Sequence, residues 1–302
     1  MSSTGRKTPG NPTVLVVGDV MVDIIVRPEG PLASGADRRA SIRPCPGGSG
    51  ANQAAWLAAC GVKARFAGRV GRADHALQGR LLEAAGVEPL LGADETLPTG
   101  ALVALIALDG ERSFLTDRGA NARLCRADLP ITLLDGVDLL HVSGYALFSP
   151  GPRAAVRELM DAAGRRDIPV TVDPASHSCL EEVGPENFLE WTRQAHICFP
   201  NEAEAAMLAG TADPEEQLRA LSRRFELVVI KRGAAGAVAA TRGGGRWRAA
   251  ASPAQVIDTS GAGDAFVAGF LAAYLQGRQV DACLRSAVAC GSRAVGRVGA
   301  RP

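Results

Sequence analysis

The stretch with the clearest chemical potential runs from residue 254 to 276, AQVIDTSGAGDAFVAGFLAAYLQ. Its small residues, Ser260 to Gly263, let the backbone come close to a ligand. Apolar residues at helical spacing follow, so we predict a helix that begins near Ala262 and offers free N–H groups and a positive dipole end to an anion. Asp264 lies in the first turn. Its carboxylate is either a helix-start charge or a base beside a bound phosphate, and the stretch alone leaves both interpretations open.

Two further candidate sites precede it. Asp23 interrupts the apolar run VMVDIIV, where it either caps a turn or binds substrate hydroxyls. The stretch PGGSGANQ, residues 46 to 53, leads into an Ala-rich helical run that ends at Gly61. Its glycines are either a flexible loop or, with Asn52 and Gln53, a hydroxyl-binding surface.

The acidic pair Glu202 and Glu204 lies where another helix is predicted to begin. These side chains either cap that helix or hold a hydrated Mg²⁺. The histidines are scattered, which favours structural roles for them. No lysine follows a Gly and precedes a Ser or Thr, so the chain has no P-loop.

The elements that must position these residues alternate between strand and helix patterns. Val14 to Val17 is a β-branched run that ends at Gly18-Asp19, which is typical of a buried parallel strand. Ligands gather at the carboxyl ends of such strands. The further predicted elements are strand 63–71, helix 74–86, strand 138–142, helix 152–164, strand 169–173, helix 185–193, strand 196–199, helices 201–209 and 214–224, and strand 226–231. This alternation predicts an α/β fold with an open parallel sheet.

A hairpin interrupts the alternation. Thr99 to Leu108 and Arg112 to Thr116 are strand-like runs separated by Asp109-Gly110, a strong short-turn signal. Residues 27 to 46 are rich in Pro, Gly and charge and are expected to form an exposed loop or short strands. Together, residues 23 to 45 and the hairpin could form a small lid over the site. Another short hairpin, flanked by glycines, is expected to end at Trp247.

Composition excludes several classes of function. The chain has 302 residues, enough for one large domain with an insert or for two domains. Its formal charge of +1 provides no basic field for nucleic acid, and no apolar run is long enough to span a membrane. Residues 1 to 12 are expected to be a disordered leader. The seven cysteines form no CxxC pair and no even framework, which favours reduced thiols in a cytoplasmic protein with a small-molecule ligand.

Three motifs in this order resemble the ribokinase-like, or PfkB, family of sugar and nucleoside kinases. They are PGGSGANQA near residue 50, PNEAE at 200 to 204 and DTSGAGDAFVAGF from 258, and the resemblance extends over nearly the whole chain. It implies a three-layer α/β/α sandwich with a mostly parallel central sheet and a small β-sheet lid. The corresponding domain would cover residues 13–302, with lid segments at about 23–45 and 97–118.

The resemblance also implies roles for residues. Asp264 matches the catalytic base that takes a proton from the substrate hydroxyl as it attacks the γ-phosphate of ATP. The backbone N–H groups of the residues before it would form the anion hole, and three residues of the first half match sugar-binding positions. The anion-hole residues are Gly261, Ala262 and Gly263, and the sugar-binding residues are Asp23, Gly48 and Asn52.

For the cofactors, the resemblance implies ATP and Mg²⁺. Asn201 and Glu204 match the segment that organises Mg²⁺ through water, and Lys231 and Gly233 match the strand end that lines the nucleotide. A potassium-type site is also implied, mostly through backbone carbonyls. Its residues would be Asp258, Ser260, Ala294, Arg297 and Gly299.

Departures from the family pattern bear on the substrate. Ribokinases commonly carry Asn at the position of Met21 and Lys at the position of Ser49, and both changes remove polar contacts to a sugar. Thr99-Gly100 stands where kinases of phosphorylated sugars usually bring an arginine, although Arg112 and Arg118 lie nearby. A kinase of a non-phosphorylated sugar is therefore expected. The alternatives are a nucleoside kinase, a non-catalytic sugar- or nucleotide-binding member, and a dinucleotide-dependent oxidoreductase. Against the last of these, this chain lacks the glycine fingerprint that such enzymes carry after the first strand. The lid could also pair two chains into a homodimer.

Overall fold

The computed structural model describes residues 11–32, 34–107 and 112–302. The predicted leader at 1–12 and the predicted turn at Asp109-Gly110 therefore lie largely or wholly outside the described residues. None of the helices in the described part of the chain has the length and hydropathy that a membrane span requires. Each of the seven cysteines is a free thiol.

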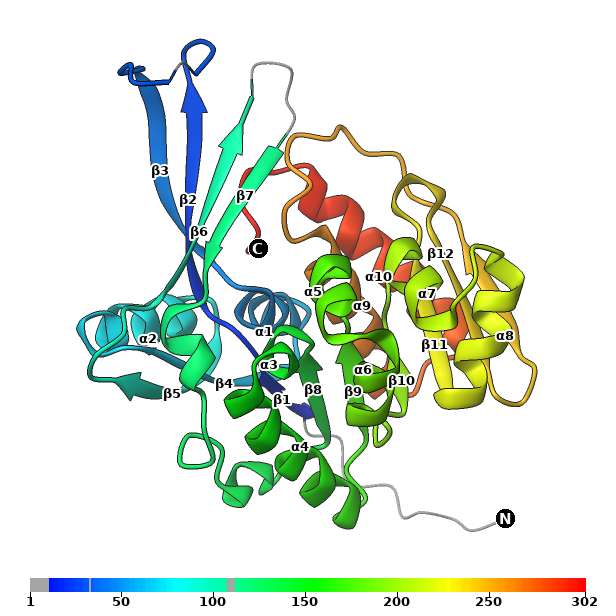
Figure 1. The fold of residues 1–302 in the computed structure, drawn as a ribbon. Coiled ribbons are helices and arrows are strands. Elements are labelled where there is room, and N and C mark those ends of the chain that lie inside the picture. The colour runs from blue at the N-terminus through cyan, green and yellow to red at the C-terminus, as the bar shows by residue number, and fades with distance from the viewer. Residues whose placement is uncertain (1–10, 33, 108–111) are drawn as a thin grey trace.

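A nine-stranded sheet forms the centre of the molecule (Figure 1), in the order β13-β12-β11-β10-β9-β8-β1-β4-β5. The strands pair in parallel except for β12, which is antiparallel to both of its neighbours. The predicted open parallel sheet is confirmed. The strands are β1 (Thr13–Val17), β4 (Lys63–Gly71), β5 (Val87–Asp94), β8 (Leu139–Ser143), β9 (Val170–Asp173), β10 (Ile197–Cys198), β11 (Leu227–Lys231), β12 (Ala237–Thr241) and β13 (Arg246–Ala249).

Helices cover both faces of this sheet. Side chains of a strand alternate between the two faces, so Val14 and Val16 of β1 pack into one core cluster and Leu15 and Val17 into the other. The first cluster lies under α1 (Ser49–Ala59), α2 (His75–Ala84), α9 (Ala262–Leu275) and α10 (Val280–Val295). The second lies under α3 (Tyr145–Phe148), α4 (Pro150–Arg165), α5 (His177–Val183), α6 (Pro185–Trp191), α7 (Glu202–Ala209) and α8 (Pro214–Arg224). The result is the expected three-layer α/β/α sandwich.

A second, four-stranded sheet projects from this body, with the order β3-β2-β6-β7 (Figure 1). Its strands are β2 (Met21–Pro28), β3 (Ala40–Gly47), β6 (Gly100–Ile106) and β7 (Arg112–Asp117). β6 and β7 are antiparallel, as the hairpin prediction requires, whereas β2 and β6 run in parallel. The register places Asp23 of β2 beside Cys45 of β3 and Leu102 of β6, at the base of this small sheet.

Some elements differ from the sequence prediction. β5, α5 and α10 were not predicted; β5 contains Pro89 and Gly92, which are weak strand formers, but it lies at the edge of the sheet, where they are tolerated. Helix α1 begins at Ser49, before the Ala-rich run. Trp247 lies within β13 and does not end the hairpin, whose turn contains residues 243 to 245.

Candidate active site

The backbone at the start of α9 requires glycine. Gly261 is the N-cap residue with a φ of 71°, a left-handed conformation that other residues rarely adopt. A Cβ atom at this position would lie 2.4 Å from the carbonyl oxygen of Ala300. The helix then begins at Ala262, as predicted, and its first turn carries Asp264. The first N–H groups of the helix, which have no partner within it, and the carboxylate therefore share one helix end, although the Ala262 N–H donates to the Thr259 carbonyl over 3.3 Å.

Asp264 accepts two side-chain hydrogen bonds from α1. The Ser49 hydroxyl donates to Oδ1 over 2.7 Å, and the Asn52 amide donates to Oδ2 over 3.2 Å. Desolvation raises the pKa of Asp264 to about 7, although the hydrogen bond from Ser49 opposes this rise. A carboxyl group with this pKa suits a general base near neutral pH. Ser49, expected only to remove a sugar contact, thus contacts the candidate base.

One cavity, of 480 Å³, lies between the small sheet and the main body, and Asp264 lies in its wall. The predicted sugar-binding residues meet here. Its lining residues are Met21, Asp23, Ile25, Leu102, Ala104, Phe114 and Thr116 from the small sheet, and Asp19, Gly48, Ser49, Asn52, Arg118, Tyr145, Asp173, Ala175, Asn201, Glu204, Lys231, Gly233, Ser260, Gly261, Gly263, Asp264 and Ala300 from the body.

Asp23 presents a carboxylate that protein groups do not satisfy. Its Oδ1 atom is buried and has no hydrogen-bond partner, and the carboxylate lies so close to Gly47 that a Cβ atom there would be 2.0 Å from Oδ1. Desolvation and the charge of Asp19 raise the pKa of Asp23 to about 6, while Arg301 opposes the rise. A buried oxygen without a partner is a candidate contact for a ligand hydroxyl.

The Gly-rich turn before α1 packs against the end of β1. Gly48 has a φ of 89°, and a Cβ atom there would lie 2.6 Å from the carbonyl oxygen of Asp19. Arg118, which also lines this cavity, is already engaged by protein groups. It lies 3.7 Å from an Asp19 carboxylate oxygen, donates to the carbonyl of Tyr145 over 3.2 Å and covers the Tyr145 ring at 4.8 Å.

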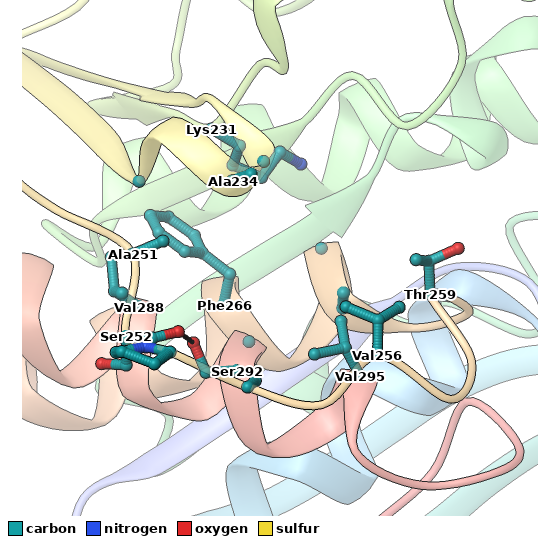
Figure 2. Close-up of a pocket in the computed structure, with 17 residues that line it drawn as sticks. Lys231, Ala234, Ala251, Ser252, Val256, Thr259, Phe266, Val288, Ser292 and Val295 are labelled. Carbon is teal, nitrogen blue, oxygen red and sulfur yellow. Dashed lines mark hydrogen bonds between the residues drawn. The ribbon is translucent and has the colours of Figure 1, made fainter.

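A second cavity, of 560 Å³, lies on the other side of the α9 start (Figure 2). It is largely apolar: Phe266 projects from α9 between the segment that carries Lys231 and the segment that carries Ser252. Val256, Val288 and Val295 line it further, and the Ser292 hydroxyl donates to the carbonyl of Ser252 over 3.3 Å. A cavity of this chemistry suits a flat aromatic group such as a nucleotide base.

Three residues line both cavities, namely Lys231, Gly233 and Gly263. The two cavities therefore meet beside the first turn of α9, and Asp264 faces the junction from the first cavity. A group bound in one cavity can therefore reach a group bound in the other beside this helix end. This arrangement fits a reaction between two substrates, with an anion at the helix terminus.

Lys231 is held at this junction by a chain of buried polar groups. Its Nζ donates to both oxygens of Asp173, and the Gln53 amide donates to Asp173 over 3.1 Å. The Gln53 carbonyl must then accept from Nε2 of His141, 3.0 Å away, so Nδ1 accepts from the Thr171 hydroxyl at 2.8 Å. Burial lowers the pKa of His141 to about 3 and keeps it neutral. The sequence motifs give Asp173 no role. Its position at the polar end of a predicted strand is the one feature that could have indicated it.

Asn201 and Glu204 cap α7 through each other. The Asn201 side chain accepts from the Glu204 N–H over 2.9 Å, and the Glu204 carboxylate accepts from the Asn201 N–H over 2.8 Å. The sequence left helix capping and Mg²⁺ binding open for Glu204, and these hydrogen bonds show that it caps the helix. Burial raises the pKa of Glu204 to about 7, opposed by Lys231. Glu202 is exposed and pairs with Arg232.

The described residues contain no cluster of three metal-ligating side chains. Mg²⁺ keeps several waters and commonly binds through one or two carboxylates and phosphate oxygens. Glu204, in the cavity wall near the junction, fits such a role through water, and the assignment of Asn201 and Glu204 to Mg²⁺ stays a prediction.

The residues predicted to hold a monovalent cation also converge. Asp258 is buried; its carboxylate accepts from the Ser260 N–H over 2.8 Å and from the Gly299 N–H over 3.2 Å. The Arg297 N–H donates to the carbonyl of Ala294 over 3.3 Å. The bond from Gly299 ties the loop before α9 to the segment after α10. The cation itself stays a prediction.

Arg301 is a second polar neighbour of the site to which the sequence motifs assign no role. Its Nε donates to Asn52 Oδ1 over 3.2 Å, and its Nη2 donates to the carbonyl of Gly47 over 3.1 Å. Figure 1 shows the C-terminal end between the base of the small sheet and α1. No motif indicates this contact, because Arg301 and Asn52 are 249 residues apart.

Comparison with known proteins agrees with this geometry. Residues 11–302 match the model of the pfkB family carbohydrate kinases. An ATP-dependent ribose-1-phosphate kinase of Halopiger xanaduensis is 32% identical, over 95% of this chain and 93% of that protein. The adenosine kinase structure of Sinorhizobium meliloti is 27% identical with a TM-score of 0.88, covering 97% of this chain and 96% of that one. The Arabidopsis thaliana ribokinase, solved with ribose and ATP, is 27% identical with a TM-score of 0.78, covering 96% and 95%.

Proposed function

Because this chain belongs to the pfkB family of carbohydrate kinases and is a phosphotransferase, we propose that it transfers the γ-phosphate of ATP to a hydroxyl of a small, non-phosphorylated sugar. One observation carries the proposal. The cavity that Asp23 and Asn52 line and the apolar cavity meet at the first turn of α9, where Asp264 stands. Proximity of two bound substrates supplies much of the rate acceleration in such a transfer.

The chemistry follows from this placement. The base of ATP would occupy the apolar cavity, and its phosphates would pass Lys231 toward the N–H groups at 261 to 263. Asp264 takes the proton of the acceptor hydroxyl as that oxygen forms a bond to the γ-phosphorus and the bond to the β-phosphate oxygen breaks, which releases ADP. The helix N–H groups and Lys231 compensate the charge on the transferring group. ATP and Mg²⁺ are typical of this family. When bound, Mg²⁺ supplies charge neutralisation at the phosphate oxygens.

The charges of the acceptor cavity support a neutral acceptor. The lining of this cavity contains five carboxyl groups and two cations, Arg118 and Lys231, of which Lys231 is paired with Asp173. The carboxyl groups are those of Asp19, Asp23, Asp173, Glu204 and Asp264. Arg118 is the arginine in its lining, and that side chain is already paired with Asp19 and stacked on Tyr145. A phosphate on the acceptor would meet like charges there, and it would have to compete with Asp19 for Arg118. Hydroxyl groups, in contrast, are suitable donors to the Asp23 oxygen that has no partner.

A nucleoside acceptor is the second candidate. The small sheet contributes an apolar wall to the same cavity, formed by Ile25, Leu102, Ala104 and Phe114, with Tyr145 opposite. Such a wall can pack against a nucleoside base, and the polar residues Asp23 and Asn52 would bind the ribose. The similarity to an adenosine kinase at 27% identity also favours this candidate.

Two further proposals concern the assembly and the monovalent cation. Ile42, Phe114 and Leu115 of the small sheet are exposed, at 62%, 56% and 68%, which favours pairing of two chains through this sheet. The cluster at Asp258 would hold K⁺ beside the loop that leads into α9. Analytical ultracentrifugation tests the first proposal, and activity in K⁺ against Na⁺ buffers tests the second.

One experiment tests the main proposal: ADP release measured across ribose, fructose, other hexoses, adenosine and other nucleosides, each with wild type and Asp264→Asn. We expect one acceptor class to stimulate ADP release, and the variant to lose about 100-fold or more. Preference for nucleosides over all sugars would replace the first candidate with the second. ATP binding without any phosphorylated product would indicate the non-catalytic alternative.

A further inference from the structure

We propose that Arg301 is a positioning residue of the acceptor site, which fixes the Asn52 side chain so that its amide nitrogen faces Asp264. The proposal rests on the kinase function above. No other assignment made for this chain gives Arg301 a role. It lies outside the three motifs and lines neither cavity, so it acts through Asn52.

The hydrogen-bonding types leave Asn52 one orientation. A guanidinium group carries only donors, so the atom of Asn52 that faces Arg301 Nε must be the carbonyl oxygen Oδ1. The amide nitrogen then faces the Asp264 carboxylate, which can only accept when ionised. Because both neighbours are charged and of opposite character, each holds the same orientation. The contacts form one chain, Arg301 to Asn52 to Asp264.

A second contact joins Arg301 to the wall behind Asp23. Its Nη2 donates to the carbonyl of Gly47, and the Asp23 carboxylate packs against Gly47 itself. The remaining nitrogen, Nη1, is buried without a hydrogen-bond partner in the described structure. Burial lowers the pKa of Arg301 to about 10, whereas Asp23 and Asp264 raise it, so the group stays charged at neutral pH. The guanidinium therefore also offsets the two carboxylates of the acceptor cavity.

Loss of Arg301 would leave the orientation of Asn52 to its hydrogen bond with Asp264 alone, so the amide would be held less firmly. A flipped amide places its oxygen against the Asp264 carboxylate, which repels it, and removes a donor from the base. Small misplacements of reacting groups cost about 100-fold in rate. We therefore expect Arg301→Met to lower kcat by about 10- to 100-fold with the best acceptor, and to change the KM for ATP little.

The first experiment compares Arg301→Met, Arg301→Gln and Arg301→Lys. Gln keeps a hydrogen-bond donor without the charge, and Lys keeps the charge with a single donor group. Recovery of kcat by Gln would therefore measure the contribution of hydrogen bonding, and recovery by Lys that of the charge. Arg223→Gln, an exposed position on α8, is the matched control and should behave as wild type. Unchanged kcat in Arg301→Met, with the fold intact by circular dichroism, would overturn the proposal.

A double-mutant cycle with Asn52→Ala tests the route of the effect. If Arg301 acts through Asn52, the double variant should be no slower than Asn52→Ala alone, because the same interaction is removed once. Independent losses that multiply would show that Arg301 acts elsewhere, and would refute the positioning role. Absence of ADP release in wild type would instead refute the proposed function, so the two failures are distinguishable.

The pH dependence of kcat/KM is a further test, because it would not change if Arg301 only stabilised the fold. The groups that face Asp264 are Ser49 and Asn52 from α1, Asp173 from β9, Lys231 from β11, and Arg301. The groups that face Asp23 are Asp19, Arg301 and Cys45 from β3. Removing the positive charge of Arg301 raises the pKa of both carboxyl groups. The acidic limb of kcat/KM should therefore move to higher pH in Arg301→Met and Arg301→Gln, and stay in place in Arg301→Lys. An acidic limb that coincides with wild type in all three would contradict the proposal.

Discussion

The Nζ atom of Lys231 lies 2.9 Å from both carboxylate oxygens of Asp173, at the point where the two cavities meet. Burial disfavours the charge on this lysine, but Asp173 and Glu204 outweigh that effect and raise the pKa of Lys231 above its usual value. The lysine thus stays protonated beside Gly263. A cation from the end of β11 therefore lies at the junction of the cavities, where the family resemblance predicts that Lys231 lines the nucleotide.

Lys231→Met is expected to lower kcat by about 100-fold, because a preorganised cation at a transferring phosphoryl group contributes as much as an oxyanion-hole donor. Steady-state kinetics with ATP and the best acceptor measure the loss. Lys63→Met, an exposed lysine at the start of β4, is the matched control. A loss confined to the KM for ATP would show that Lys231 only binds the nucleotide.

The pH dependence should report Asp264. The ionised carboxylate is the active form of a base, so kcat/KM should be constant above the pKa of about 7 and fall roughly tenfold per pH unit below it. Glu204 has a pKa near the same value, so the profile is measured again in Glu204→Gln. The acidic limb should persist in that variant. Its disappearance would assign the limb to Glu204.

Ser49→Ala should move the same limb to higher pH. The Ser49 hydrogen bond stabilises the ionised form of Asp264 and lowers its pKa, so removal of the hydroxyl raises that pKa further. At pH 7 a smaller fraction of the base is then ionised, while activity at pH 9 should be close to wild type. A uniform loss at every pH would instead indicate that Ser49 contacts the substrate.

Gln53→Leu should destabilise the fold. The substitution leaves the buried Asp173 without one donor and the buried His141 without its Nε2 acceptor. Each unsatisfied buried group costs about 1 to 3 kcal/mol of unfolding free energy. Urea denaturation measures the change, with the exposed Gln276→Leu as control. Equal midpoints for the two variants would show that the chain of polar groups adds no stability.

Local patterns in the sequence were sufficient for most of the fold. Apolar runs with β-branched residues predicted β1, β4 and β11, and helical spacing placed the start of α9 at Ala262. Such patterns follow from side-chain alternation and helical periodicity, which need no knowledge of distant residues. Segments without a strong pattern were missed: β5 is a strand because β4 offers it a partner, despite its proline.

By itself, the sequence determined which residues could do the chemistry. The glycines at 48 and 261, where a side chain would clash with the backbone of Asp19 or Ala300, and the carboxylate of Asp264 are recognisable within short motifs. Only the tertiary structure decided what surrounds them. Ser49 contacts Asp264 although 215 residues separate them, and Arg301 contacts Asn52 although 249 residues separate them. The sheet order and the packing of α1 against α9 set these contacts, and no local pattern encodes them because each partner looks like an ordinary polar residue in its own segment.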